Sequence, residues 1–133
     1  MSILLEAYAS TTAALGTMTL LLLVQLVIAD ITGITWKHTP GTSVAEDHGN
    51  LLFRAVRTVA NTNESIAIFI CALLFCVLSG ASPDYTAYGA WAFVTFRLIY
   101  AICYYSNLQT PRSIAFGFSL LSLVALLITG VST

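Results

Sequence analysis

The segment SIAFGFSLLSLVALLITGVST, residues 113–133, contains no charged side chain and is dominated by apolar residues. A membrane-spanning helix needs roughly 20 consecutive, mainly apolar residues. A strand of a membrane β-barrel would instead alternate apolar and polar residues over about ten positions. Residues 119–127 show no such alternation. The segment therefore predicts a transmembrane helix.

In the rest of the chain, the charged residues are separated by intervals long enough for three more membrane helices. The charges that mark these intervals are Glu6, Asp30, Glu64, Asp84, Arg97 and Arg112. The expected helices cover residues 8–30, 51–79, 85–106 and 113–131. These spans predict an all-α fold, a single four-helix integral membrane domain over residues 1–133.

The composition of the 133-residue chain agrees with this fold class. Hydrophobic residues make up 58%, charged residues only 8%, and the mean hydropathy is +0.88. A water-soluble domain has about 25% charged residues, and disordered chains are polar, so both classes are excluded. The net charge of −1 provides no basic face for phosphates, which argues against a nucleic-acid partner.

The few basic residues predict the orientation in the membrane, because Lys and Arg concentrate in cytoplasmic loops. Lys37, Arg54 and Arg57 lie in or beside the first loop, residues 32–50, and Arg112 closes the third loop. The second loop, residues 80–84, has no basic residue. We therefore expect a multi-pass protein with the first and third loops in the cytoplasm and both termini on the opposite side.

The second predicted helix carries a polar stripe made of Arg54, Arg57, Asn61 and Glu64. Steps of three and four residues place side chains on one helical face. Beyond Glu64 the helix is continuously apolar, so the stripe enters the membrane. A carboxylate there usually faces a bundle interior or a wet cavity.

The third predicted helix presents Arg97, Tyr100 and Tyr104 on one face, again at spacings of three and four. Arg97 lies within an apolar stretch and needs a partner. One hypothesis is a structural pair between Arg97 and Glu64 that locks the two helices together. The alternative is that both helices line a polar ligand pocket.

Arg112 is expected at the N-terminus of the fourth helix. Pro111 precedes it, and proline suits the first turn of a helix. The positive helix end and the guanidinium together favour an anion, such as a carboxylate or a thiolate. The alternative is that Arg112 only anchors the topology. His38 and His48 lie ten residues apart without a second ligand at metal-site spacing, so no metal is expected.

The segment from Arg57 to Glu64 resembles the R-x-x-x-N-x-x-E signature of the membrane-associated proteins in eicosanoid and glutathione metabolism, the MAPEG family. Arg97, Tyr100 and Tyr104 match the R-x-x-Y-x-x-x-Y pattern of that family's third helix. The loop from Leu108 to Arg112 is most similar to the microsomal glutathione transferase branch. The resemblance is best between Arg54 and Phe116.

The resemblance implies a homotrimer with glutathione as co-substrate, bound between neighbouring subunits near the cytoplasmic face. It implies that Arg112 is the catalytic residue that stabilises the glutathione thiolate. The acceptor would be a lipophilic small molecule, an electrophile or hydroperoxide, that enters from the membrane lipid. The implied glutathione-binding residues are Arg54, Arg57, Asn61, Glu64, Tyr100 and Tyr104, with Arg97 as a structural or pocket residue.

Three functions remain open at this point. The first is a membrane-bound glutathione transferase or peroxidase with a role in detoxification. The second is a non-enzymatic lipid-binding scaffold of the same family, which would not need a thiolate-activating arginine. The third is a small carrier that uses Glu64 and Arg97. A carrier would favour helices broken within the membrane, and the interiors of these helices contain no proline.

Overall fold

A computed structural model describes residues 2–133 as five helices. The bounds of the helices are α1 Ser2–Ala7, α2 Ala9–Thr35, α3 Leu51–Ser79, α4 Pro83–Tyr105 and α5 Gln109–Val131. The last four are long and apolar enough to cross a membrane. This confirms the all-α fold with four helices of membrane-spanning length.

Some helix bounds differ from those expected. Helix α2 continues to Thr35, so the first loop covers only residues 36–50, because Asp30 interrupts the apolar run without breaking the helix. Helix α5 begins at Gln109 rather than at residue 113. Pro111 is tolerated in this first turn, because the first backbone N–H groups of a helix have no partner within it. The short helix α1 was not expected.

The ends of helix α3 follow from local sequence. The side chain of Asn50 accepts a hydrogen bond from the backbone N–H of Leu52 at 2.8 Å, which caps the start of the helix. Gly80 adopts a left-handed conformation with φ of 72° at the other end. The N–H of Ala81 then donates to the carbonyl of Cys76 at 2.9 Å. These contacts fix where the helix enters and leaves the bundle.

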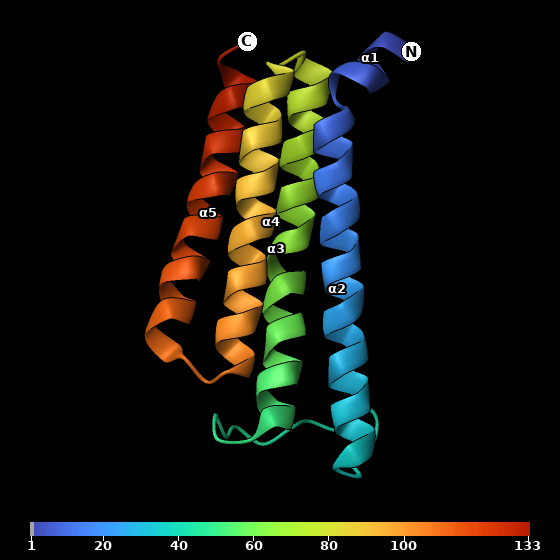
Figure 1. Ribbon diagram of the computed structural model, residues 1–133, viewed down its shortest axis with the longest axis vertical. Coiled ribbons are helices and arrows are strands. Elements are labelled where there is room, and N and C mark those ends of the chain that lie inside the picture. Colours follow the sequence, from blue (N-terminus) through green and yellow to red (C-terminus); the bar gives the residue numbers. More distant parts are fainter. Residues whose placement is uncertain (1) are drawn as a thin grey trace.

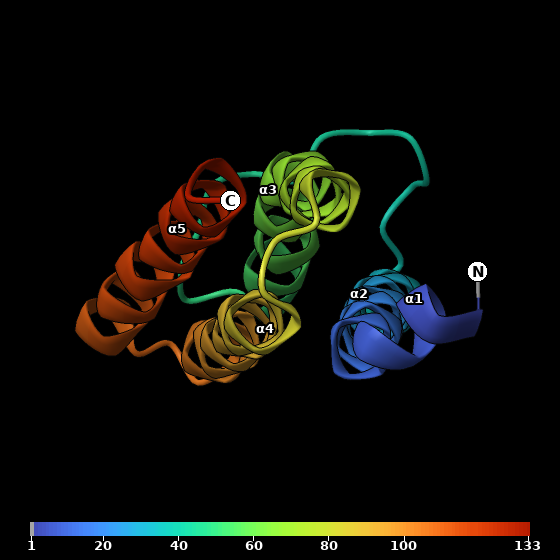
Figure 2. The same ribbon diagram turned by 90° about the horizontal axis from the view of Figure 1, so that it is seen from above.

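The four long helices stand side by side, with both termini at one end of the bundle (Figure 1). The α2–α3 and α4–α5 connections lie at the other end. Seen from above, α4 lies between α2 and α5, and α5 is inclined to the other helices (Figure 2). The basic first and third loops therefore share one end, which we call the loop end.

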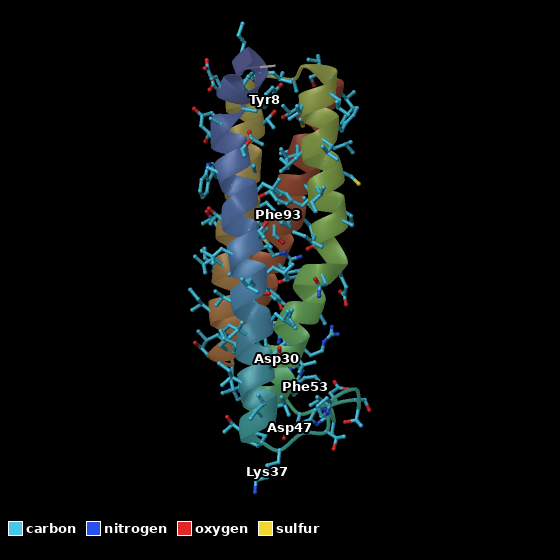
Figure 3. The ribbon with its side chains drawn as sticks, turned by 90° about the vertical axis from the view of Figure 1, so that its right-hand side faces the viewer. Tyr8, Asp30, Lys37, Asp47, Phe53 and Phe93 are labelled. Carbon is cyan, nitrogen blue, oxygen red and sulfur yellow. The ribbon has the colours of Figure 1, made fainter. Side chains whose placement is uncertain are left out.

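The half of the bundle nearer the termini holds the main apolar cluster, and the largest buried polar side chain, Arg97, lies in the half nearer the loop end. Phe69 of α3 stacks on Phe93 of α4 with ring centroids 4.4 Å apart, and both are fully buried. Phe93 lies near mid-height, whereas Lys37 and Asp47 lie at the loop end (Figure 3). On the loop side of these phenylalanines, the buried side chains include the polar Thr62, Ser65 and Arg97 as well as apolar ones. The site is therefore expected between this apolar core and the loop end.

Close packing of α4 against α5 depends on Gly89. A Cβ atom added there would lie 2.8 Å from Cγ of the fully buried Leu126. We expect Gly89→Ala to lower the free energy of unfolding by about 1–3 kcal/mol through overpacking. Gly117→Ala is the matched control, because nothing lies within 4 Å of its added Cβ. Thermal unfolding in mild detergent measures both, and equal melting temperatures would contradict this packing.

Candidate functional site

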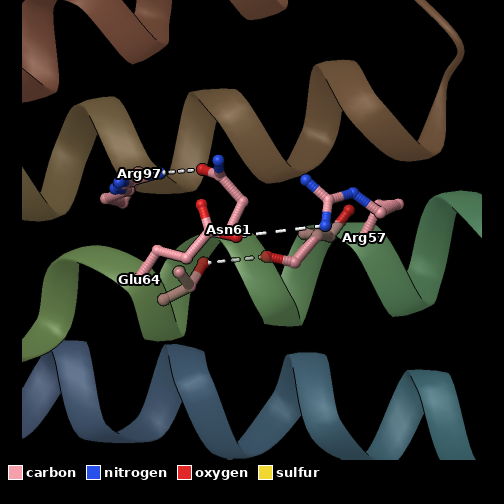
Figure 4. A network of polar contacts seen from close by, with 6 residues as sticks. Arg57, Asn61, Glu64 and Arg97 are labelled. Carbon is pink, nitrogen blue, oxygen red and sulfur yellow. Dashed lines mark hydrogen bonds and ion pairs between the residues drawn. The ribbon is translucent and has the colours of Figure 1, made fainter.

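Arg97 of α4 is fully buried among polar and aromatic groups. Its Nη1 donates to Oδ1 of Asn61 at 2.6 Å (Figure 4). Its Nη2 donates to Oγ of Ser65 at 2.5 Å. Three aromatic rings surround the guanidinium with centroids 5.4–5.5 Å from Cζ. They belong to Phe93, Tyr100 and Phe116. Arg97 thereby joins α3, α4 and α5.

The hypothesis of an ion pair between Glu64 and Arg97 is wrong within one subunit, as far as the described residues show. Glu64 instead lies 3.9 Å from Nη1 of Arg57, and its side chain is 62% exposed. Both residues sit on the same face of α3 (Figure 4). Neutral oxygen acceptors on Asn61 and Ser65 hold Arg97 in place of a carboxylate. Because its side chain is exposed, Glu64 can contact a neighbouring molecule while it pairs with Arg57.

Two tyrosines of α4, Tyr100 and Tyr104, are buried and connect Arg97 with Arg112. The ring centroids of Tyr100 and Tyr104 lie 5.6 Å apart. The guanidinium of Arg112 lies over the Tyr104 ring, with Cζ 4.4 Å from the centroid. A guanidinium that stacks on an aromatic ring keeps its N–H donors free, because they point outward in the plane of the guanidinium itself. Arg112, in the first turn of α5, is thus held by stacking and can still bind an anion.

A cavity of about 250 Å³ opens between α3, α4 and α5 where these groups meet. Residues from three separate stretches of the sequence line it. They are Arg57, Asn61, Tyr100, Tyr104, Arg112, Ser113 and Phe116. We call this space the inner cavity. Five of the predicted site residues therefore share one cavity.

A second cavity of about 450 Å³ adjoins the inner cavity on the loop side. We call it the outer cavity. Its lining includes Arg57 and Tyr104, which also line the inner cavity, and it adds Glu46, His48 and Phe53. The first loop therefore contributes to the same depression as the helices. Together the two cavities fall within the size range typical of small-molecule sites.

The two cavities suit a polar, anionic molecule of moderate size. Two guanidinium groups supply up to ten N–H donors, and Asn61 supplies an amide. Guanidinium groups bind carboxylates in a bidentate way, and the same positive charge favours a thiolate over a thiol. Within the described residues, no group of three His, Cys, Asp or Glu side chains is placed to hold a metal ion.

A family model described as the MAPEG family matches residues 8–132, nearly the whole chain. The chain belongs to the MAPEG family. No curated protein matches its sequence. Membership in the MAPEG family suggests glutathione-related transferase or peroxidase chemistry, or a role in eicosanoid metabolism.

Three predicted site residues of this MAPEG chain, Arg54, Glu64 and Arg97, do not line either cavity. Arg54 was expected to bind the ligand, but its Nη1 donates to the carbonyl of His48 at 2.7 Å. Side chains of a helix tilt toward its N-terminus, and Arg54 lies in the first turn of α3. It therefore reaches back to the loop. Arg54 fastens the first loop to α3 and does not line the cavities.

Sequence reasoning missed several residues of the MAPEG site, including Ser65, Glu46 and His48. Ser65 holds Arg97, and its place one residue after Glu64, four beyond Asn61, puts it within reach of the same guanidinium. That spacing was a usable signal. Glu46 and His48 line the outer cavity from the loop, and loop residues carry no periodic pattern. Only the three-dimensional path of the loop reveals them.

Proposed function

We propose that this MAPEG protein is a membrane-bound glutathione transferase or peroxidase. The observation that carries the proposal is the position of Arg112. Its guanidinium lies over the Tyr104 ring and lines the inner cavity. Arg57 and Asn61 line the same cavity, and their guanidinium and amide groups would bind the charged and amide groups of a peptide. The substrate would be glutathione, and the second substrate a lipophilic electrophile or hydroperoxide.

The chemistry requires a thiolate. A free thiol has a pKa of about 8.5 and is mostly protonated at neutral pH. Arg112 would stabilise the anion after the thiol proton passes to water. The thiolate sulfur then forms a bond to the electrophilic carbon, and the leaving group departs with the bonding electrons. With a hydroperoxide, the sulfur takes the terminal oxygen and releases an alcohol, and a second glutathione then forms the disulfide and water.

We also propose that the functional unit is a homotrimer, with each site completed by a neighbouring subunit. Glu64 and Arg57 lie on a membrane-length helix with side chains 62% and 43% exposed. A charged pair facing lipid is costly, so a different face of a neighbouring copy would cover it, as in a three-fold ring. Because the site lies at the loop end, which holds most of the basic residues, we place it near the cytoplasmic face.

The scaffold alternative draws on a different feature. An apolar groove of about 360 Å³ lies between α3 and α5, lined by Ile68, Cys71, Ala72, Phe75, Leu123, Val124 and Leu127. A lipid chain would fit such a groove without any reaction. The catalytic proposal is favoured because lipid binding in this groove would not need the guanidinium of Arg112 in the separate inner cavity.

A conjugation assay with a chromogenic electrophile tests the proposed function. Protein purified in mild detergent should accelerate the reaction of glutathione over the rate in buffer. Native mass spectrometry of the same sample should show three chains. A monomer with full activity would overturn the trimeric site. Lipid binding without acceleration of any electrophile or hydroperoxide would favour the scaffold.

A further inference from the structure

The short helix α1 leaves the bundle at Tyr8. This residue lies between α1 and α2, and its side chain is buried. Its hydroxyl donates a hydrogen bond to the carbonyl of Ala81 in the α3–α4 connection. Figure 2 shows α1 projecting sideways from the end of α2, away from the other long helices. Tyr8 therefore fixes the point where α1 departs, at the end that holds both termini, which we call the terminal end.

Apolar side chains of α1 are exposed in the subunit. Ile3 is 80% exposed and Leu4 is 48% exposed. Spacings of three and four residues place Ile3, Leu4 and Ala7 on one side of α1 and leave Glu6 outside that side. An isolated helix shorter than about 12–15 residues is marginal in water. A six-residue helix with uncovered apolar groups therefore needs a surface to lie on.

Exposed aromatic side chains mark the boundary between membrane and water at the same end. Tyr85 and Tyr88, in the first turns of α4, are 66% and 69% exposed. Nε1 of Trp91 donates to Oγ of Ser10, at the start of α2, at 3.1 Å. Tyr and Trp concentrate at the level of the lipid headgroups. The start of α2, and with it α1, therefore lies at the depth of the headgroups.

The length of α2 leads to the same depth. From Ser10 to Trp36 the helix rises about 39 Å, at about 1.5 Å per residue. A bilayer measures about 40–45 Å with its headgroup layers. Trp36 is 54% exposed at the loop end and suits the boundary there. Ser10 then lies at the opposite boundary, so the chain before it has already left the hydrocarbon core.

We propose that α1 is an interfacial helix that binds the headgroup layer of the leaflet at the terminal end. Ile3, Leu4 and Ala7 turn toward the acyl chains, and Glu6 stays on the aqueous side. Helices of this kind bury an apolar face about 5–10 Å into the boundary. Helix α1 precedes the segment that matches the family, residues 8–132. The inference does not depend on the transferase or peroxidase function.

A fluorescent label that distinguishes water from lipid tests the proposal. Ile3→Cys, Leu4→Cys and Glu6→Cys each carry a nitrobenzoxadiazole group in a Cys71→Ala background, because the other two native cysteines are buried. The full-length protein is placed in phosphatidylcholine vesicles with and without a lipid that bears a nitroxide quencher near its carbonyl groups. We expect blue-shifted emission and strong quenching at positions 3 and 4, and emission closer to that in water at position 6.

Ala45→Cys is the matched control in an exposed part of the first loop. The same label there shows how the dye behaves without an interfacial helix, and it should emit as in water. Emission as in water at positions 3 and 4 would overturn the proposal. Blue-shifted emission without quenching by the lipid would place a neighbouring protein chain over α1 and would also overturn it. Equal quenching at positions 3, 4 and 6 would contradict the assigned face.

Discussion

Arg112→Ala should slow glutathione conjugation at neutral pH by about 10- to 30-fold. An opposite charge within about 4–6 Å commonly lowers a pKa by 1–3 units. A thiol of pKa about 8.5 is only about 3% ionised at pH 7 without that help, so losing the charge lowers the thiolate fraction by up to about 30-fold. The rate should recover partly at higher pH, where the thiol ionises without help. Glutathione affinity should change less, because Arg57 and Asn61 remain in the inner cavity. Steady-state rates across a pH series measure the effect.

Arg112→Lys separates charge from geometry. A lysine keeps the positive charge but loses the planar fork and the stacking on Tyr104. We expect an intermediate rate with the pH profile displaced less than in the alanine variant. Equal rates and equal pH profiles for the wild type and Arg112→Ala would reduce Arg112 to a topology anchor. The lipid-binding scaffold would then be better supported than the transferase or peroxidase function.

Removing both hydrogen-bond partners of Arg97 should have the largest effect on stability. In the double variant Asn61→Ala with Ser65→Ala, the fully buried guanidinium loses both of its hydrogen bonds. Leaving a buried charge without its partners typically costs about 3–5 kcal/mol. We expect a correspondingly lower free energy of unfolding, measured by thermal or denaturant unfolding in detergent.

A triple variant that adds Arg97→Met makes this prediction sharper. Methionine fills much of the same space without a charge, and replacing a buried ion by an apolar residue is often neutral or stabilising. The triple variant should therefore be more stable than the double variant. Leu98→Ala is the control for truncation on the same helix, because Leu98 is 46% exposed. A triple variant less stable than the double would contradict this role for Arg97.

Helical periodicity explains why much of the candidate site could be anticipated. Spacings of three and four residues placed Arg57 with Asn61 on α3, and Tyr100 with Tyr104 on α4. The structure brings these four and Arg112 to one cavity. Periodicity identifies a face of a helix, and antiparallel neighbours must then bring polar faces together because lipid excludes them.

The partners of individual charges were not predictable in the same way. Periodicity put Glu64 and Asn61 on one face, but it could not decide which of them meets Arg97. That choice depends on the depth at which α4 packs against α3, and Asn61 with Ser65 lies at the right level. Glu46 belongs to a loop whose path depends on tertiary contacts such as the Arg54–His48 hydrogen bond. No local pattern in the sequence encodes that path.

The central claim is that this cavity binds glutathione as a thiolate, and one titration tests it directly. The ultraviolet absorbance of the thiolate is followed against pH with glutathione bound to the purified wild-type protein. The account predicts a midpoint about 1–3 pH units below that of free glutathione, and a return toward the free value in Arg112→Ala. A bound thiol that titrates at the same pH as free glutathione would contradict the account.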